Sequence, residues 1–323
     1  MKIGVLGMGA YGIALANVFY KNENDVCIWT KFKEELDSVS LIRENAAVLP
    51  GVKIPKRIEL TDNIEKCVLE KDIIVVAIPM NALRDVLKEL ANYLDSKQVV
   101  CLVTKGIEEK TSKFVFEVAG DELNTKNICM LSGPSIAIEL ANFSPTGFVV
   151  VSKSEFANLT VKVCLENRDL IVNTSQDVIG IEVTSAVKNV FAILCGYVHG
   201  SERKYSDSLK AAILSKLVTE LDKLIGFFGG EKETFLGYAG LGDMLLTCTS
   251  DKSRNYTFGK LIGEGNKKSE AMKLMNVKTV EGLPTLEIIY KMLQEKNYKV
   301  NSINVLYDIV YKNKKVDNIL KEI

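Results

Sequence analysis

The sequence has 323 residues, a formal net charge of zero and a hydrophobic share of 47%. This length corresponds to about two domains with sizeable cores, and the composition is ordinary for a globular protein. The charge balance argues against a nucleic-acid-binding protein or one held on an anionic membrane surface. Any anion site must therefore be a local group of cations.

The first half of the chain alternates between short apolar strands and helices. The predicted strands cover residues 2–7, 25–30, 71–79, 97–106, 127–131, 146–152 and 169–175. Helices are expected between them, the first at 10–21 and the second at 32–44. Continuous apolar runs such as "IIVVAI" are typical of parallel strands that are covered on both faces. The alternation predicts an α/β fold with a Rossmann-like, doubly wound parallel sheet.

The second half reads almost entirely as helix. The predicted helices cover residues 183–198, 209–228, 255–262, 285–295 and 303–311. No strand pattern is convincing there. We therefore assign residues 1–177 to a dinucleotide-binding domain and residues 178–323 to an all-α substrate or catalytic domain.

The chain begins with a glycine motif that follows a strand and opens a helix. In Gly7-x-Gly9-x-x-Gly12, the first glycine permits a tight turn and the second lets a pyrophosphate approach the backbone. The third lets helix and strand pack closely, and the helix N-terminus offers free N–H groups to the anion. The alternative is a glycine-rich turn inside a core, but the strand–turn–helix context favours a dinucleotide site.

The end of the second strand bears on the choice of cofactor. An acid near this point would bind the ribose of NAD. The chain instead has Thr30 and Lys31, with Lys33 close behind. A hydroxyl and cations suit a 2′-phosphate and favour NADP, with NAD possible. Equally, the two lysines could simply begin a surface helix.

The seven cysteines and the single histidine do not suggest a metal site. The cysteines include no C-x-x-C pair and lie mostly within apolar runs, as buried thiols in a reducing compartment do. His199 cannot build a metal site alone, so no metal is expected. No apolar run reaches the ~18 residues needed to cross a bilayer. We expect a cytoplasmic protein that is not embedded in a membrane.

Six segments, taken together, resemble the bacterial-type NAD(P)-dependent glycerol-3-phosphate dehydrogenases. They are "GMGAYGIALA", "TKGIE", "SGPSIAIE", "SAVKNVFAI", "GLGDMLLTCTSDKSRNYTFG" and "VEG", in this order over nearly the whole chain. The resemblance implies interconversion of dihydroxyacetone phosphate and sn-glycerol 3-phosphate with NAD(P)H. It also implies a supply of glycerol phosphate for phospholipids.

Lys188 matches the catalytic lysine of that family. It lies in a helix among apolar or small residues, where burial lowers the pKa of a lysine and suits it to proton transfer. By the resemblance, Lys188 protonates the ketone oxygen during reduction and takes the proton back in reverse. The alternative is a snorkelling lysine with an exposed tip.

The resemblance also implies two groups of binding residues. The substrate is expected to contact Lys105, Gly133, Ser135, Asp243, Ser253, Arg254 and Asn255. The cofactor is expected to contact Gly7, Gly9, Ala10, Tyr11, Gly12, Thr30, Lys31, Lys105, Ala137, Arg254, Thr279 and Glu281. Arginine offers a planar fork for phosphate, and Ser253 could equally cap a helix.

Two other readings of the sequence remain. A ketopantoate reductase or β-hydroxyacid dehydrogenase shares a glycine loop, a helical second domain and a catalytic lysine, but needs a carboxylate site. A non-catalytic nucleotide sensor would need the glycines without Lys188, Asp243 and Arg254 together. A homodimer through the helical half is expected, because its helices are apolar on more than one face.

Overall fold

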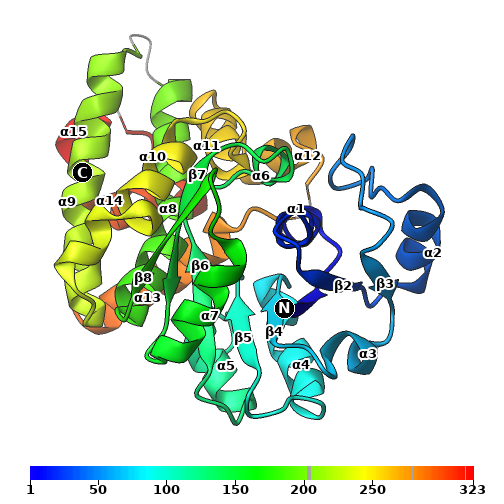
Figure 1. Ribbon diagram of the computed structural model, residues 1–323. Coiled ribbons are helices and arrows are strands. Elements are labelled where there is room, and N and C mark those ends of the chain that lie inside the picture. Colours follow the sequence, from blue (N-terminus) through cyan, green and yellow to red (C-terminus); the bar gives the residue numbers. More distant parts are fainter. Residues whose placement is uncertain (202–204, 278, 317) are drawn as a thin grey trace. The chain divides into compact units, whose positions relative to one another are not determined.

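A computed structural model of the chain describes residues 1–201, 205–277, 279–316 and 318–323 (Figure 1). Part of the irregular segment 200–216, namely residues 202–204, lies outside the described residues. The chain divides into two compact units. Unit 1 comprises Met1–Lys105 and Phe114–Val178, and unit 2 comprises Gly106–Lys113 and Ile179–Ile323.

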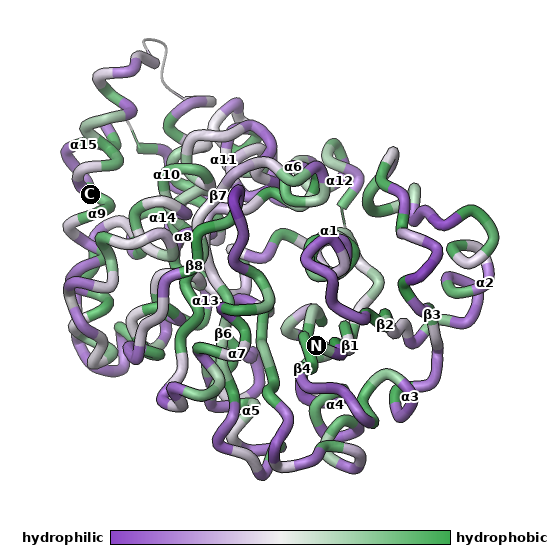
Figure 2. Tube along the Cα trace, in the orientation of Figure 1, coloured by the Kyte–Doolittle hydropathy of each residue, from purple (hydrophilic) through white to green (hydrophobic). Residues whose placement is uncertain are grey.

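Unit 1 is built on an eight-stranded sheet in the order β3-β2-β1-β4-β5-β6-β7-β8. Its strands are β1 (Lys2–Leu6), β2 (Asp25–Trp29), β3 (Glu59–Thr61), β4 (Ile73–Val76), β5 (Val99–Leu102), β6 (Ile128–Ser132), β7 (Thr146–Val151) and β8 (Leu170–Ser175). Hydrophobic residues concentrate along the central strands (Figure 2). Every residue of β4, β5 and β6 is buried, because helices cover both faces of the sheet.

The helices of unit 1 follow the strands as expected of a doubly wound fold. They are α1 (Ala10–Lys21), α2 (Lys33–Ile42), α3 (Ile64–Val68), α4 (Met80–Ala91), α5 (Val115–Glu122), α6 (Ala137–Ala141) and α7 (Glu155–Leu165). α1 packs against α6 and α7, whereas α4 packs against α3 and α5. α4 shows why these segments are helical: Leu83, Val86, Leu87 and Leu90 form one buried stripe at helical spacing.

The expectation of an entirely parallel sheet was wrong for the last two strands, because β7 and β8 are parallel to each other but run opposite to β1–β6. β7 runs antiparallel to β6, with Leu131 paired to Val150. The hydroxyl of Thr146 donates to the carbonyl of Pro134 at 2.5 Å, so the chain re-enters the sheet at the end where it left. The intervening helix α6 has only five residues and does not carry the chain back along the sheet. Strand β3 and helix α3 were also absent from the prediction.

The described residues of Ile179–Ile323 in unit 2 form helices and loops without a strand, whereas the short segment Gly106–Lys113 is not helical. The elements of unit 2 are α8 (Val178–Ser201), α9 (Asp207–Phe228), η1 (Lys232–Leu236), η2 (Tyr238–Gly242), α10 (Asp243–Thr249), α11 (Arg254–Gly263), α12 (Lys268–Leu274), α13 (Gly282–Glu295), α14 (Asn301–Lys312) and α15 (Ile319–Glu322). The short elements η1, η2, α10, α12 and α15 were not predicted. α8 starts five residues before the predicted position, since residues 178–182 continue the same helix.

α8 is the core helix of unit 2. Among the described residues it is the one helix long and apolar enough to cross a membrane, and 94% of the relevant window is buried inside the protein. α11 packs against it with almost no space between the backbones. A Cβ placed on Gly196 of α8 would lie 2.0 Å from the carbonyl oxygen of Tyr256, and one on Gly259 of α11 would lie 1.9 Å from that of Ile193. This close crossing fixes the start of α11 relative to α8.

Candidate functional site

The glycine loop of unit 1 has the geometry of an anion cradle. A Cβ on Gly7 would lie 2.4 Å from the carbonyl oxygen of Ala77, and one on Gly12 would lie 2.0 Å from that of Gly7. These two glycines are therefore required by packing. A Cβ on Gly9 would meet no protein atom within 4 Å, and Gly9 is the N-cap of α1 without a side-chain cap. Open space beside uncapped N–H groups fits the pyrophosphate of a dinucleotide.

A second loop of unit 1 approaches this glycine loop. The hydroxyls of Tyr11, in the first turn of α1, and Ser135 lie 2.8 Å apart. Ser135 also donates to the carbonyl of Gly133 at 3.2 Å. A Cβ on Gly133 would lie 2.4 Å from the carbonyl oxygen of Gly147 on β7. The structure thus groups Ala10, Tyr11, Gly133 and Ser135, while Ala137 begins α6 just beyond them.

The residues after β2 form a hydrogen-bond network in which the Thr30 side chain bonds to neighbouring protein groups. Its hydroxyl donates to the carboxylate of Glu35 and accepts the N–H of Phe32 at 3.2 Å. Thr30 is buried, whereas Lys31 and Lys33 are exposed. Glu35 also accepts the amide of Asn45 at 2.8 Å. Sequence reasoning missed both Glu35 and Asn45 because it searched for an acid at the strand end, not in the following helix.

Lys105 is the last residue of the Met1–Lys105 segment of unit 1 and lies just beyond the carboxyl end of β5. The hydroxyl of the preceding Thr104 donates to the carbonyl of Ile78 at 2.7 Å, which ties this loop to the segment after β4. Lys105 itself is partly exposed. Its position at the carboxyl end of the sheet is where ligands bind in open α/β folds.

Unit 2 contains a buried ion pair. The ammonium group of Lys188 on α8 donates to the carboxylate of Asp243 at the start of α10, and their side chains are 5% and 3% exposed. Thr247 donates its hydroxyl to the carbonyl oxygen of Asp243 at 2.7 Å and lies 3.3 Å from the Oδ1 atom. A buried lysine held by a carboxylate is an oriented proton donor and acceptor.

The thiol of Cys248 packs beside this ion pair. Its Sγ atom lies 3.8 Å from the carbonyl oxygen of Lys188. Burial and a hydrogen bond with Cys195 hold the pKa of the Cys248 thiol well above its usual value, so the thiol stays neutral. All seven cysteines are free and buried. The thiols beside Lys188 therefore act as apolar packing.

A polar group formed by Ser253, Arg254 and Asn255 lies at the start of α11. Arg254 is exposed, and its guanidinium lies 3.3 Å from the carboxylate of Glu281. The next residue, Asn255, is buried and accepts the N–H of Gly282 at 2.9 Å. Ser253 accepts the N–H of Tyr256 at 3.3 Å and thereby caps α11. Arg254 and Asn255 thus sit at a helix N-terminus, a favourable place for an anion.

Glu281 links this group to the helix that carries Lys188. Its second carboxylate oxygen accepts the side-chain amide of Asn189 at 3.3 Å, and Asn189 directly follows Lys188. Thr279 is exposed on the segment before Glu281. Sequence reasoning missed Asn189 and Thr247, although one adjoins Lys188 and the other lies one helical turn after Asp243. Unit 2 therefore brings together Lys188, Asp243, Arg254, Asn255 and Glu281.

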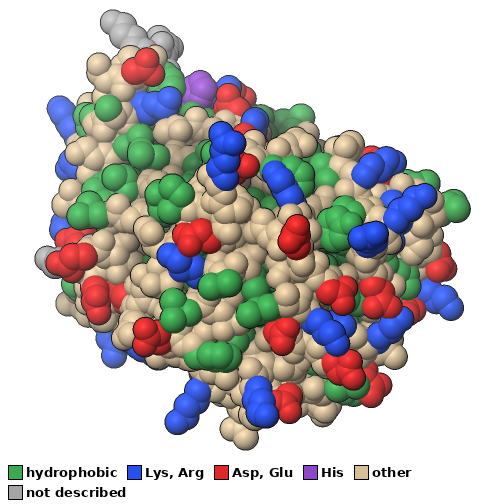
Figure 3. Space-filling view, viewed as in Figure 1, with side chains coloured by type: hydrophobic (Ala, Val, Ile, Leu, Met, Phe, Trp, Pro, Cys, Tyr) green, Lys and Arg blue, Asp and Glu red, His purple; other side chains and the backbone are tan. Residues whose placement is uncertain are grey.

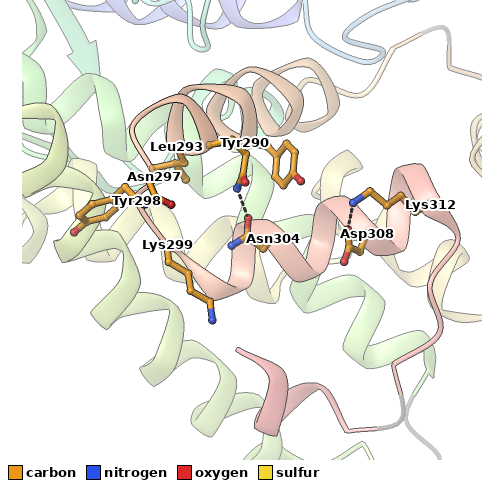
Figure 4. Close-up of a pocket in the computed structure, with 9 residues that line it drawn as sticks. Tyr290, Leu293, Asn297, Tyr298, Lys299, Asn304, Asp308 and Lys312 are labelled. Atoms are coloured by element: carbon orange, nitrogen blue, oxygen red, sulfur yellow. Dashed lines mark hydrogen bonds and ion pairs between the residues drawn. The ribbon is translucent and has the colours of Figure 1, made fainter.

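A separate groove of unit 2 lies between α13 and α14 and has a volume of about 370 Å³ (Figure 4). Its charged and polar groups are largely engaged with one another. Lys312 pairs with Asp308 at 2.7 Å, and Gln294 donates to Asn304 at 3.1 Å. None of the residues that line the groove belongs to the Lys188 cluster. This groove is therefore separate from the Lys188–Asp243 pair.

Comparison with known proteins gives matches over both halves of the chain. Residues 2–157 match the family model described as the N-terminus of NAD-dependent glycerol-3-phosphate dehydrogenase, and residues 177–321 match that of its C-terminus. A glycerol-3-phosphate dehydrogenase [NAD(P)+] of Staphylococcus carnosus is 36% identical, over 99% of this chain and 96% of that protein.

Solved structures agree with these matches. The glycerol-3-phosphate dehydrogenase of Coxiella burnetii superposes with a TM-score of 0.91 at 28% identity, covering 99% of this chain and 98% of that one. A ketopantoate reductase from Ralstonia eutropha reaches a TM-score of only 0.59 at 10% identity, over 96% of this chain and 97% of that one. The second likeness concerns the fold alone.

Proposed function

The chain belongs to the NAD-dependent glycerol-3-phosphate dehydrogenase family, and from this premise we propose how its residues carry out the reaction. It is an oxidoreductase that interconverts dihydroxyacetone phosphate and sn-glycerol 3-phosphate with NAD or NADP. The observation that carries the proposal is the buried Lys188–Asp243 pair. When bound, the nicotinamide cofactor supplies the hydride for reduction and takes it in oxidation.

Lys188 is the general acid and base of this proposal. During reduction its ammonium group donates a proton to the oxygen of the ketone, and during oxidation the neutral amine takes the proton from the alcohol. Asp243 orients the amine through the buried hydrogen bond, and Thr247 fixes Asp243 from the same helix. Burial of Lys188 keeps water from competing for the proton.

The phosphate of the substrate is bound by the group at the start of α11. Arg254 offers a fork of N–H donors, and Asn255 and Ser253 lie beside it. Lys105, Gly133 and Ser135 of unit 1 are proposed as further substrate contacts. The support for a phosphate over a carboxylate substrate is the family match; an arginine alone would serve either anion.

Unit 1 is proposed to hold the cofactor. The loop of Gly7, Gly9 and Gly12, with Ala10 and Tyr11, would bind the pyrophosphate, since the open side of Gly9 leaves room for it. Ala137, Thr30, Lys31, Lys105, Arg254, Thr279 and Glu281 complete the proposed cofactor contacts. In this division of labour, residues 1–177 bind the dinucleotide and residues 178–323 supply the catalytic lysine and most of the substrate site.

The cellular role we infer is supply of glycerol phosphate for phospholipid synthesis by a cytoplasmic enzyme. On the face shown in Figure 3, acidic and basic side chains are interspersed, which suits a small-molecule substrate better than nucleic acid. We also infer a homodimer through the helical half. The exposed side chains of Leu236 and Leu245, 72% and 42% accessible, support it, and light scattering of the purified protein tests it.

The test compares Lys188→Met with Lys223→Met, an exposed lysine of α9. Reduction of dihydroxyacetone phosphate should fall by about 10²–10⁴-fold in kcat for the first variant and stay unchanged for the second. Arg254→Ala should instead raise KM for this substrate more than it lowers kcat. Undiminished kcat in a folded Lys188→Met protein would remove Lys188 from the mechanism. Faster oxidation of NADPH with ketopantoate would favour the rival activity.

Loss of folding must be separated from loss of chemistry. Removing one member of a buried ion pair leaves the other charge uncompensated, at a cost of about 3–5 kcal/mol. The double variant Lys188→Met/Asp243→Leu removes both charges and should recover most of that stability, measured by urea unfolding. It should remain inactive, because neither the proton donor nor its partner is present. If wild type turns over and this variant binds the cofactor without turnover, Lys188 and Asp243 serve catalysis. A non-catalytic nucleotide sensor would not need them.

A further inference from the structure

We propose that Glu35 makes the nucleotide pocket discriminate against a 2′-phosphate, so that this chain binds NADH in preference to NADPH. The inference rests on the proposed role of unit 1 in binding the dinucleotide. It identifies a specificity residue that the sequence pattern at the strand end does not indicate. It also reverses the preference suggested there by Thr30 and Lys31.

The position of Glu35 is the first step. In doubly wound sheets the adenosine ribose lies at the carboxyl end of the second strand, and an acid there accepts its 2′-hydroxyl. β2 ends at Trp29, and Glu35 lies in the first turn of α2, which follows at once. The helix brings its carboxylate back to Thr30, the first residue after the strand.

The second step is that this carboxylate is held firmly in place. One oxygen accepts the hydroxyl of Thr30, and the other accepts the amide of Asn45 at 2.8 Å. The same amide nitrogen lies 3.0 Å from the carbonyl oxygen of Met8, between the first two glycines of the loop. Thr30 and Asn45 are only 2% and 6% exposed. A fixed negative charge is thereby tied to the glycine loop itself.

The two ligands differ in charge and in the hydrogen-bond partners that they need. A 2′-phosphate brings a charge of about −1.5 to −2 and needs donors, but the Thr30 hydroxyl and the Phe32 N–H are already used within the network. A ribose hydroxyl can instead donate to a free lone pair of the Glu35 carboxylate. Lys31 and Lys33 are exposed, so solvent and salt screen them more than the partly buried carboxylate.

The experiment measures binding of two nucleotide fragments, 5′-AMP and 2′,5′-ADP, to the intact protein by titration calorimetry. Wild type should bind 5′-AMP more tightly. Glu35→Gln removes the charge while its amide oxygen can still accept from Thr30, and it should shift the affinity ratio toward 2′,5′-ADP by about tenfold or more. Glu34→Gln, at the exposed neighbouring position, is the matched control and should leave the ratio unchanged. Lys31→Ala should keep the preference for 5′-AMP.

Three outcomes would overturn the inference. Tighter binding of 2′,5′-ADP by wild type would show that the lysines dominate. An unchanged ratio in Glu35→Gln, with its melting temperature preserved, would show that the carboxylate does not face the ribose. Binding of neither fragment would refute the nucleotide role of the glycine loop as well, and so distinguishes failure of the proposed function from failure of this inference. The ratio of kcat/KM for NADH and NADPH should follow the fragment ratio.

Discussion

At the residue scale, His199 is placed to respond to pH. Its Nδ1 atom lies 2.8 Å from the hydroxyl of Tyr256, and its ring stacks on Tyr205 at 4.3 Å. Burial raises the pKa of Tyr256, so its hydroxyl stays protonated and shares a hydrogen bond with the imidazole of His199. Protonation of His199 would place a positive charge in this partly buried contact, next to the residue that follows Asn255.

The free energy of unfolding should therefore decrease as the pH falls below the ordinary pKa of histidine. Burial is the largest cause that lowers the pKa of His199, and the positive charges of Lys260 and Lys210 lower it further. The negative charges of Asp251 and Glu264 raise this pKa and partly oppose the decrease. A folded pKa below the unfolded value of about 6.5 means that the unfolded chain binds the proton better. The stabilisation is present above about pH 6.5 and is lost as the pH falls toward the folded pKa. Urea midpoints at about pH 7.5 and 5.5 measure it.

The control is His199→Gln, which keeps a hydrogen-bonding side chain that does not titrate. Because the chain has a single histidine, the difference between wild type and this variant isolates one group. We expect the wild-type midpoint to drop more than that of the variant over this interval. Equal drops would mean that His199 carries no linkage to folding.

Other residues show what can and cannot be predicted from sequence. The family resemblance implied that Lys188 and Asp243 share a site, and the structure pairs their side chains directly. Glu35 could not be assigned in this way, because its role depends on a helical turn that points it back at Thr30. A motif records positions along the chain, whereas this network depends on the path of the backbone between them.

At the scale of elements, the close crossing of α8 and α11 should be intolerant of any side chain at its centre. Gly259→Ala places a Cβ 1.9 Å from the carbonyl oxygen of Ile193, so the helices must separate. We expect a loss of about 2–3 kcal/mol in the free energy of unfolding. KM for dihydroxyacetone phosphate should also rise, since α11 carries Arg254.

Gly226→Ala in α9 is the matched control. A Cβ there meets nothing within 4 Å, and the helix should gain about 0.5–1 kcal/mol because alanine is the better helix former. Denaturant unfolding of the two variants gives both values. A Gly259→Ala protein as stable as wild type would show that the crossing adjusts freely.

Helices and strands also differ in how well the hydrophobic pattern of the sequence predicts them. Long apolar strands and α4 were predicted because period and burial agree. The three residues of β3 and the five-residue segment η2 are too short to carry a period. The direction of β7 depends on where α6 ends, which is a property of the tertiary fold. Such features need the three-dimensional context that the sequence pattern lacks.

At the scale of the whole molecule, the cysteines report separately on the two units. Cys27, Cys67, Cys101, Cys129 and Cys164 belong to unit 1, whereas Cys195 and Cys248 belong to unit 2. All are buried, and burial raises the pKa of the Cys164 and Cys129 thiols, so the native protein should react slowly with a thiol reagent. Each unit has its own core, which is the condition for unfolding as a separate cooperative unit.

Thiol labelling along a urea series should therefore proceed in two steps, one of five thiols and one of two. Adding 5′-AMP should shift only the five-thiol step to higher urea, because a ligand stabilises the unit that binds it and not the other. Mass spectrometry of the labelled peptides assigns each thiol to its step. A single step of all seven would mean that the units unfold together, and a ligand shift of the Cys195 and Cys248 step would place the nucleotide in unit 2. The labelling pattern thus tests where the nucleotide binds without relying on turnover.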